Sequence, residues 1–135
     1  MAKNKDRGSI LEGQTFWMNA RLLGPNDAQL FRADITSGTL NVYDPKSATP
    51  DTAVHTITLL FAADPGTGFN CMFTALQTDG HWTKDNVGYA FQYGLTPSDY
   101  AMAGSKTYRI EVDLVTDDYD LLPMVWFCAV EERAG

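Results

Sequence analysis

The sequence predicts an all-β fold, an antiparallel β-sandwich of about 7 to 9 short strands. Apolar and polar residues alternate with a period of two through most of the chain, which is typical of strands that bury one face. Clusters of Gly, Pro, Asn and Asp interrupt this alternation at short intervals and predict turns. Helical features occur only near 96–103, a stretch long enough for one short helical turn.

Four strands are predicted in the first half of the chain, at 14–23, 28–35, 39–44 and 54–61. In the first strand, Phe16 and Met18 alternate with Trp17 and Asn19, so that one face is apolar and the other is mixed. The turn residues "GPND" and "TSG" separate the first three strands. Two prolines in 45–53 predict a surface loop before the fourth strand.

Four more strands are predicted in the second half, at 69–76, 87–95, 107–116 and 121–130. The third of these has the clearest alternation, with an apolar face made of Tyr108, Ile110, Val112 and Leu114. The acidic segment "TDDYD" predicts a hairpin turn between the last two strands. In the short helical turn near 96–103, Thr96 is the expected cap, Pro97 suits the first helical position and Asp99 lies in the first turn.

The last predicted strand is apolar on both faces, because Val125 and Phe127 alternate with Trp126 and Cys128. This strand is expected either in the centre of a sheet or with its second face covered by a neighbouring subunit. The chain has two cysteines, Cys71 and Cys128, without the spacing of a metal site. We expect both thiols to be reduced and buried; a disulfide requires that their strands be neighbours.

The chain of 135 residues is acidic, with 10 Lys and Arg against 17 Asp and Glu and a net charge of −7. Lys3, Lys5 and Arg7 against a single aspartate give residues 1–7 a charge of +2, which leaves 7 basic and 16 acidic residues, or −9, elsewhere. We therefore expect an extended basic N-terminal arm at 1–9 and a single β-sandwich domain at 10–135. An acidic body repels phosphate backbones, which argues against a nucleic-acid partner. No apolar run approaches the roughly 18 residues that cross a bilayer, so we expect no membrane partner and synthesis in the cytoplasm.

The polar segment "TDGHWTKDNVGYAF" is the strongest candidate for a catalytic or metal site, since it contains Asp79, His81 and Asp85. A zinc site needs three or four ligands, and the only other histidine, His55, belongs to a different predicted strand. Nucleophilic catalysis needs a hydroxyl or thiol beside a base, and no G-x-S-x-G elbow occurs. We interpret the segment as a polar corner of the sheet, and predict no catalytic residue, no cofactor and no metal.

Two other functions remain open from the residues alone. A carbohydrate-binding module is one, in which exposed aromatic side chains at Trp82, Tyr89 or Trp126 contact a sugar. The other is a small hydrolase that uses the paired carboxylates of the 117–120 hairpin tip. An exposed Trp82 would favour the carbohydrate-binding module, and a deep pocket with two facing carboxylates would favour the hydrolase.

Three segments resemble a family of small structural proteins of tailed bacteriophages. They are "QLFRADITSGTLNVYD" (29–44), "HWTKDNVGYAFQY" (81–93) and "GSKTYRIEVDLVT" (104–116). This family is similar to the N-terminal immunoglobulin-like domain of phage baseplate upper proteins, and the resemblance covers roughly residues 10–130. The motifs are strand-packing patterns, and Ala90 stands where the corner motif of the family has a polar residue.

The resemblance implies an immunoglobulin-like sandwich and a non-enzymatic component of the virion. We expect a capsid decoration or cement subunit, present in many copies, whose partners are phage structural proteins such as the major capsid protein. A tail, neck or baseplate component is the closest alternative. Lys3, Lys5 and Arg7 are the expected interface residues of the arm, and Trp82 and Trp126 are candidate exposed aromatic contacts.

Overall fold

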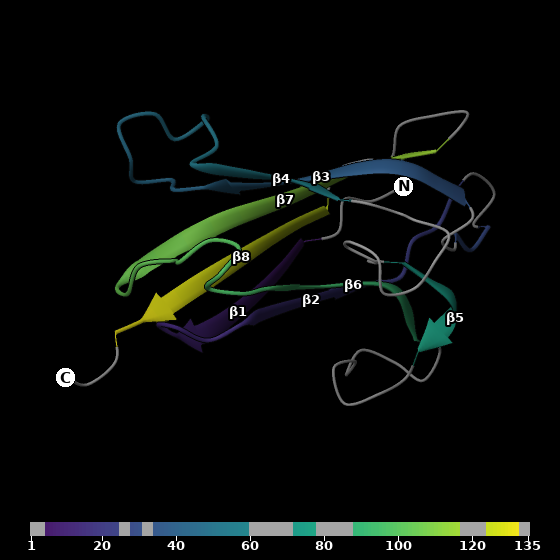
Figure 1. The fold of residues 1–135 in the computed structure, drawn as a ribbon, viewed down its shortest axis with the longest axis horizontal. Coiled ribbons are helices and arrows are strands. Elements are labelled where there is room, and N and C mark those ends of the chain that lie inside the picture. The colour runs from purple at the N-terminus through teal and green to yellow at the C-terminus, as the bar shows by residue number, and fades with distance from the viewer. Residues whose placement is uncertain are drawn as a thin grey trace.

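The computed structural model describes residues 5–24, 28–30, 34–59, 72–77, 88–116 and 124–132. Their strands form two layers (Figure 1). In chain order the strands are β1 (Lys5–Leu11), β2 (Phe16–Ala20), β3 (Ile35–Tyr43), β4 (His55–Leu59), β5 (Met72–Gln77), β6 (Tyr89–Leu95), β7 (Lys106–Thr116) and β8 (Met124–Glu131). One sheet has the order β1-β8-β7-β3-β4 and the other has the order β2-β6-β5. The predicted all-β sandwich is therefore confirmed.

The order of the strands is that of an immunoglobulin-like domain. Such domains place the third, sixth and seventh lettered strands (C, F and G) side by side in one sheet and B, E and D in the other. In this chain β3, β7 and β8 occupy the C, F and G positions, and β2, β6 and β5 occupy B, E and D. The additional strand β4 lies beside β3, where variable-type domains carry C′.

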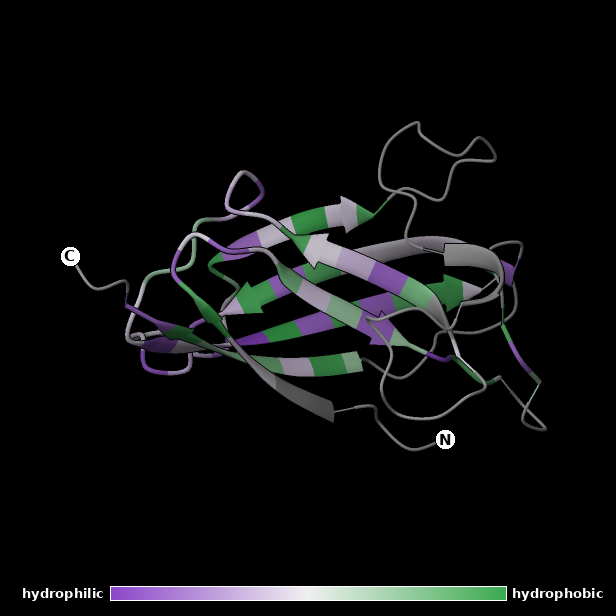
Figure 2. Cartoon of the chain, turned by 90° about the horizontal axis from the view of Figure 1, so that it is seen from below, coloured by the Kyte–Doolittle hydropathy of each residue, from purple (hydrophilic) through white to green (hydrophobic). Residues whose placement is uncertain are grey.

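The core lies between the two sheets, and the alternation of each strand determines which residues enter it. Figure 2 shows this alternation as bands of hydrophobic and hydrophilic residues along the strands. On β7 the predicted apolar face, Tyr108, Ile110, Val112 and Leu114, is buried. On the facing sheet the buried residues are Phe16, Met18 and Ala20 from β2 and Phe91, Tyr93 and Leu95 from β6. Phe91 and Trp126 stack across the core with ring centroids 6.0 Å apart, so they join the two sheets directly.

Strand β8 lies inside the five-stranded sheet, between β1 and β7. Its inward residues Trp126, Cys128 and Val130 are buried, and on its outer face Val125 is also buried. Of the two placements expected for this strand, a position inside a sheet is therefore the one found. On its outer face Phe127 and Ala129 are half-buried.

The N-terminal region differs from the predicted arm. Residues from Lys5 onward form β1, which pairs with β8 in parallel, with Lys5 opposite Val125 and Leu11 opposite Glu131. Residues 5–9 of the expected arm are therefore part of the five-stranded sheet, and the sandwich is not purely antiparallel. The sequence did not predict β1 as a strand because its apolar alternation is weak. Gly8, which lies beside Phe16, brings no apolar side chain to the core.

One strand break is corrected, and the single turn expected near 96–103 is present. The segment "TSG" does not separate two strands, since Ile35–Tyr43 is continuous as β3 and the register shift between Ile35 and Ser37 absorbs the irregularity. The 96–103 region makes one turn closed by hydrogen bonds to the carbonyl of Thr96 from the amides of Asp99 and Tyr100. Within the described ranges this turn does not continue into a helix.

Candidate functional site

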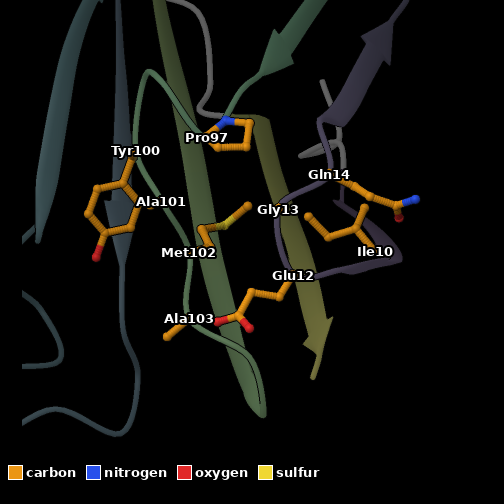
Figure 3. Close-up of a pocket in the computed structure, with 9 residues that line it drawn as sticks. All are labelled: Ile10, Glu12, Gly13, Gln14, Pro97, Tyr100, Ala101, Met102 and Ala103. Atoms are coloured by element: carbon orange, nitrogen blue, oxygen red, sulfur yellow. The ribbon is translucent and has the colours of Figure 1, made fainter. Parts of the chain in front are cut away.

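Among the described residues, a groove of about 260 Å³ lies between two loops of the sandwich (Figure 3). One wall is the turn between β1 and β2, which contributes Ile10, Glu12, Gly13 and Gln14. The other wall is the crossover from β6 to β7, which contributes Pro97 and residues 100–103. The groove therefore lies between two loops that connect different sheets.

Short hydrogen bonds hold the β1–β2 turn. The Gln14 side-chain carbonyl accepts a bond from the Leu11 amide at 2.9 Å, and the Gln14 amide donates to the Leu11 carbonyl at 3.0 Å. Gly13 has φ 90°, a left-handed conformation that glycine adopts without a side-chain clash. The Glu12 amide donates to the Glu131 carbonyl at 2.8 Å and ties this turn to the end of β8.

Thr96 and Asp99 cap the crossover reciprocally. The Asp99 amide donates to the Thr96 hydroxyl at 3.2 Å, and the Thr96 amide donates to the Asp99 carboxylate at 3.1 Å. This is the arrangement of a capping box, with Asp99 in the position usually held by Glu. The Tyr93 hydroxyl donates to the same carboxylate at 3.1 Å and anchors the turn to β6. The sequence prediction that Thr96 caps this turn is confirmed.

A carboxylate joins the two walls of the groove. The Gly104 amide donates to Oε2 of Glu12 at 2.9 Å, and Figure 3 shows the Glu12 carboxylate directed toward the crossover. A Cβ atom at Gly104 would lie 2.7 Å from Cγ of Glu132, so only glycine allows this close approach. The hydrogen bond between Glu12 and Gly104 therefore fixes the spacing of the two loops.

The lining of the groove suits packing more than covalent chemistry. Ile10, Met102 and Pro97 provide apolar surface, and none of the nine lining residues is a serine, threonine, cysteine, histidine or lysine. Glu12 already accepts a backbone hydrogen bond. An arrangement of this kind can receive a small apolar side chain of another molecule.

A cluster of aromatic and charged residues lies on the other side of the crossover. The ring of Tyr100 stacks on His55 at a centroid distance of 5.2 Å and meets Tyr108 edge-on at 6.0 Å. Burial raises the pKa of Tyr100. Nearby, Nζ of Lys106 lies 2.8 Å from Oδ2 of Asp44, and this hydrogen bond lowers the pKa of Asp44. The cluster fastens the crossover and the 44–54 loop to the beginning of β7.

Most residues of the polar segment singled out in the sequence lie outside the described part of the structure, including Asp79, His81, Trp82 and Asp85. The same holds for the acidic hairpin tip at 117–120 and for Cys71. Within the described ranges, no group of three or more His, Cys, Asp and Glu side chains is placed to hold a metal ion. No helix in those ranges could span a membrane.

The predicted interface residues are placed as follows. Lys3 lies outside the described residues, and Lys5 and Arg7 belong to β1, where they pair in register with Val125 and Phe127. Trp126 is only 3% exposed, so its assignment as an exposed aromatic contact is wrong. Its side chain faces inward because β8 presents Trp126, Cys128 and Val130 to the other sheet.

Cys128 is a free, buried thiol. Desolvation raises its pKa to about 12, so the reactive thiolate is scarce at neutral pH. A thiol in this environment packs as a small apolar group and is unsuited to nucleophilic catalysis.

The structure reveals an exposed aromatic residue that the sequence analysis did not select. Trp17 on β2 is 49% exposed and pairs in register with Gly94 on β6. A Cβ atom at Gly94 would lie 2.8 to 3.0 Å from three adjacent carbons of the indole six-membered ring. Three nearly equal distances place the ring face, and not its edge, over Gly94. The alternation of β2 could have predicted this exposure. Trp17 shares the outer face of the strand with Asn19, whereas Phe16 and Met18 are on the buried face.

Comparisons with protein-family models, with curated proteins and with solved structures find no match to this chain.

Proposed function

We propose that this protein is a non-enzymatic structural component of a bacteriophage virion, and specifically a capsid decoration subunit. The proposal is supported by where the three family-like segments lie in the fold. Segment 29–44 contains β3, segment 104–116 contains β7, and the described end of segment 81–93 lies in β6. These strands build the centre of both sheets, so the resemblance concerns the framework of an immunoglobulin-like sandwich.

A decoration subunit acts by burying its surface against several neighbours. The groove between the β1–β2 turn and the crossover offers an apolar recess for a partner side chain. The basic residues of 1–7 offer charge of the opposite sign to an acidic neighbour. Each such contact is weak when exposed to water, and repetition over many copies in one particle gives a strong total attachment.

A position in the tail, neck or baseplate is the alternative within the same proposal. Immunoglobulin-like modules are held in place by their surfaces wherever they occur, and the fold itself does not select a location. The number of copies per particle distinguishes a capsid decoration subunit from a tail, neck or baseplate component. A decoration subunit repeats over the whole capsid lattice, and a tail component does not.

The test is electron cryo-microscopy of purified particles of the phage that encodes the chain, combined with quantitative mass spectrometry of their proteins. We expect density for the sandwich on the capsid lattice and a copy number proportional to that of the major capsid protein. Density confined to the tail or baseplate would replace the decoration role by the alternative. Particles that lack the chain altogether would contradict the virion proposal.

The contribution of the basic residues is tested by charge reversal. Lys3→Glu should release the subunit from particles at a lower salt concentration than the wild type needs, because exposed ion pairs are screened by salt. Lys46→Glu is the matched control, since Lys46 is an exposed lysine in the 44–54 loop and its replacement changes the net charge equally. Equal release of both variants would show that only net charge matters.

A further inference from the structure

The groove between the β1–β2 turn and the crossover has apolar walls and carries a carboxylate. Ile10, Pro97 and Met102 provide the apolar surface. Glu12 also lines the groove, and its carboxylate accepts the hydrogen bond from the Gly104 amide (Figure 3). A carboxylate has about four lone-pair sites, so Glu12 keeps the capacity to accept a further hydrogen bond beside those it already has.

The end of β8 adds negative charge beside the groove. The carbonyl of Glu131 accepts a hydrogen bond from the Glu12 amide at 2.8 Å, and Glu132 lies against Gly104. The side chains of both glutamates are exposed. The ammonium group of Lys106 is already paired with a carboxylate on the other side of the crossover. The groove therefore suits a group that has an apolar stem and a positively charged end.

A lysine side chain has this chemistry. Its methylene groups pack on apolar surface while its ammonium group stays in contact with water or with a carboxylate. The volume of the groove, about 260 Å³, is below the roughly 300 to 1,000 Å³ of pockets that hold small molecules. The groove is therefore better matched to one side chain of a protein than to a small-molecule ligand.

We infer that the groove receives Lys3 of a second copy of this chain. Residues 1–7 carry a net charge of +2 and the rest of the chain carries −9, so the basic segment of one copy is attracted to the body of another. Within this segment Lys5 and Arg7 belong to β1 and pair in register with β8. Lys3 precedes the strand and is not part of this pairing.

The same copy cannot supply this lysine, because its own groove is out of reach. Ile10 is the first groove residue in β1 and lies about 17 Å from Lys5, at a rise of roughly 3.3 Å per residue. Two fully extended residues and a lysine side chain reach only about 13 Å from Lys5. Docking of Lys3 therefore joins the basic segment of one copy to the groove of the next. A head-to-tail contact of this kind builds a ring or an open chain of subunits.

The contact needs no other phage protein, so the inference goes beyond the proposed function. One side chain in a groove buries far less than the roughly 800 Å² per partner of a stable interface, and we expect a Kd of roughly 0.1 to 1 mM. Added salt should weaken the association further, because salt screens an exposed ion pair.

The experiment measures self-association of the full chain by sedimentation velocity at low salt and at concentrations up to about 1 mM. We expect the sedimentation coefficient of the wild type to rise with concentration. Lys3→Ala removes the docking side chain, and Ala101→Lys places a positive charge on the exposed wall of the groove. Each variant should lower the association constant by about 5-fold. Lys46→Ala and Ala48→Lys are the matched controls, since both residues are exposed in the 44–54 loop, and they should associate as the wild type does.

A mixture of the two variants tests the direction of the contact. Lys3→Ala keeps an intact groove and Ala101→Lys keeps Lys3, so each variant supplies the half that the other lacks. We expect the mixture to form dimers with the association constant of the wild type and no larger species. In ¹³C NMR of the wild type, the methyl signals of Ile10 and Met102 should shift with concentration, which would place the contact in the groove.

Four results overturn the inference. They are a wild type whose sedimentation does not depend on concentration, a Lys3→Ala or Ala101→Lys variant that associates as the wild type does, a mixture that stays monomeric, and association that appears only after removal of residues 133–135. The last result would mean that the end of the same chain occupies the groove. Unchanged circular dichroism of both variants shows that loss of association does not come from unfolding. Each result concerns the isolated chain and leaves the virion proposal to its own test.

Discussion

Two strand glycines each lie against an aromatic ring, but the rings differ in their freedom to move. A Cβ atom at Gly8 would meet Cε1 of Phe16 at 2.8 Å, and one at Gly94 would meet Trp17 at the same distance. Phe16 is buried in the core, whereas Trp17 is half exposed. A buried ring must shift its neighbours to escape, and an exposed ring can swing into solvent.

We therefore expect Gly8→Ala to be more destabilising than Gly94→Ala. Overpacking a core costs about 1 to 3 kcal/mol, and Gly8→Ala belongs in this range. Gly94→Ala should cost less and should increase the exposure of Trp17, seen as a red shift of its fluorescence. Urea unfolding of both variants measures the difference. An equal loss of stability would contradict the freedom assigned to Trp17.

Two aspartates are predicted to affect stability with opposite signs. The hydrogen bond from Lys106 lowers the pKa of Asp44, so the folded state favours the charged form. Burial and the neighbouring Glu111 raise the pKa of Asp113, so the folded state disfavours its charge. The ionised Asp44 stabilises the folded state at pH values above the ordinary aspartate pKa of about 3.9. This stabilisation is lost as the pH falls through the lower pKa that Asp44 has in the folded state. The protonated Asp113 stabilises the folded state at low pH. This stabilisation is lost as the pH rises through the raised pKa that Asp113 has in the folded state.

At pH 7 we expect Asp44→Asn to lower the melting temperature and Asp113→Asn to raise it. Both differences from the wild type should shrink as the pH falls below about 4, where the carboxyl groups become protonated. Differential scanning calorimetry from pH 3 to pH 7 measures this. A difference that does not depend on pH would assign the effect to lost packing and not to charge.

At the scale of elements, β1 is the segment that the sequence analysis described least well. Its seven residues, Lys5–Leu11, pair with β8 and cover one edge of it. Inside β1 only Ile10 packs against the core among the residues with described side chains, so apolar alternation is weak there. Parallel pairing with the last strand joins the two ends of the sequence, which a local pattern does not reveal.

Truncation separates the residues before β1 from β1 itself. Removing residues 1–4 leaves the whole register of β1 and should leave the melting temperature unchanged. Removing residues 1–10 uncovers β8 and should lower the melting temperature and promote aggregation, because an exposed apolar strand edge pairs with other chains. Thermal unfolding and light scattering measure both effects. Equal stability of the two truncated chains would show that β1 contributes nothing to the fold.

Other elements were predicted well. The buried face of β7 and the buried face of β2 follow the period of two in the sequence, and the cap at Thr96 follows from its residue type. The break at "TSG" was predicted wrongly because turn residues also occur at strand irregularities, where pairing to β7 continues across the shift.

At the scale of the whole molecule, the sandwich depends on contacts between its sheets. Trp126 from β8 stacks on Phe91 from β6, and both are buried. Trp17 is half exposed and lies against Gly94 of its own sheet. We expect Trp126→Ala to destabilise the fold by about 3 to 5 kcal/mol, as for other large core truncations. Trp17→Ala should cost about 1 kcal/mol or less, as surface substitutions usually do.

Chemical denaturation of the two tryptophan variants measures this contrast. A small effect of Trp126→Ala would mean that the two sheets are held together elsewhere. A large effect of Trp17→Ala would mean that the indole supports the sheet.

The sequence by itself determined the fold class, the faces of the clear strands, the acidic charge and the cap at Thr96. Each of these depends on residue types and on neighbours within a few positions along the chain. The tertiary structure decided the order of the strands, the parallel pairing of β1 with β8, the burial of Trp126 and the exposure of Trp17. Alternation shows which residues share a face, but pairing between distant strands decides which face is covered. For this reason the groove of Glu12 and Met102 and the surface of Trp17 and Gly94 appear only when segments far apart in the sequence are brought together.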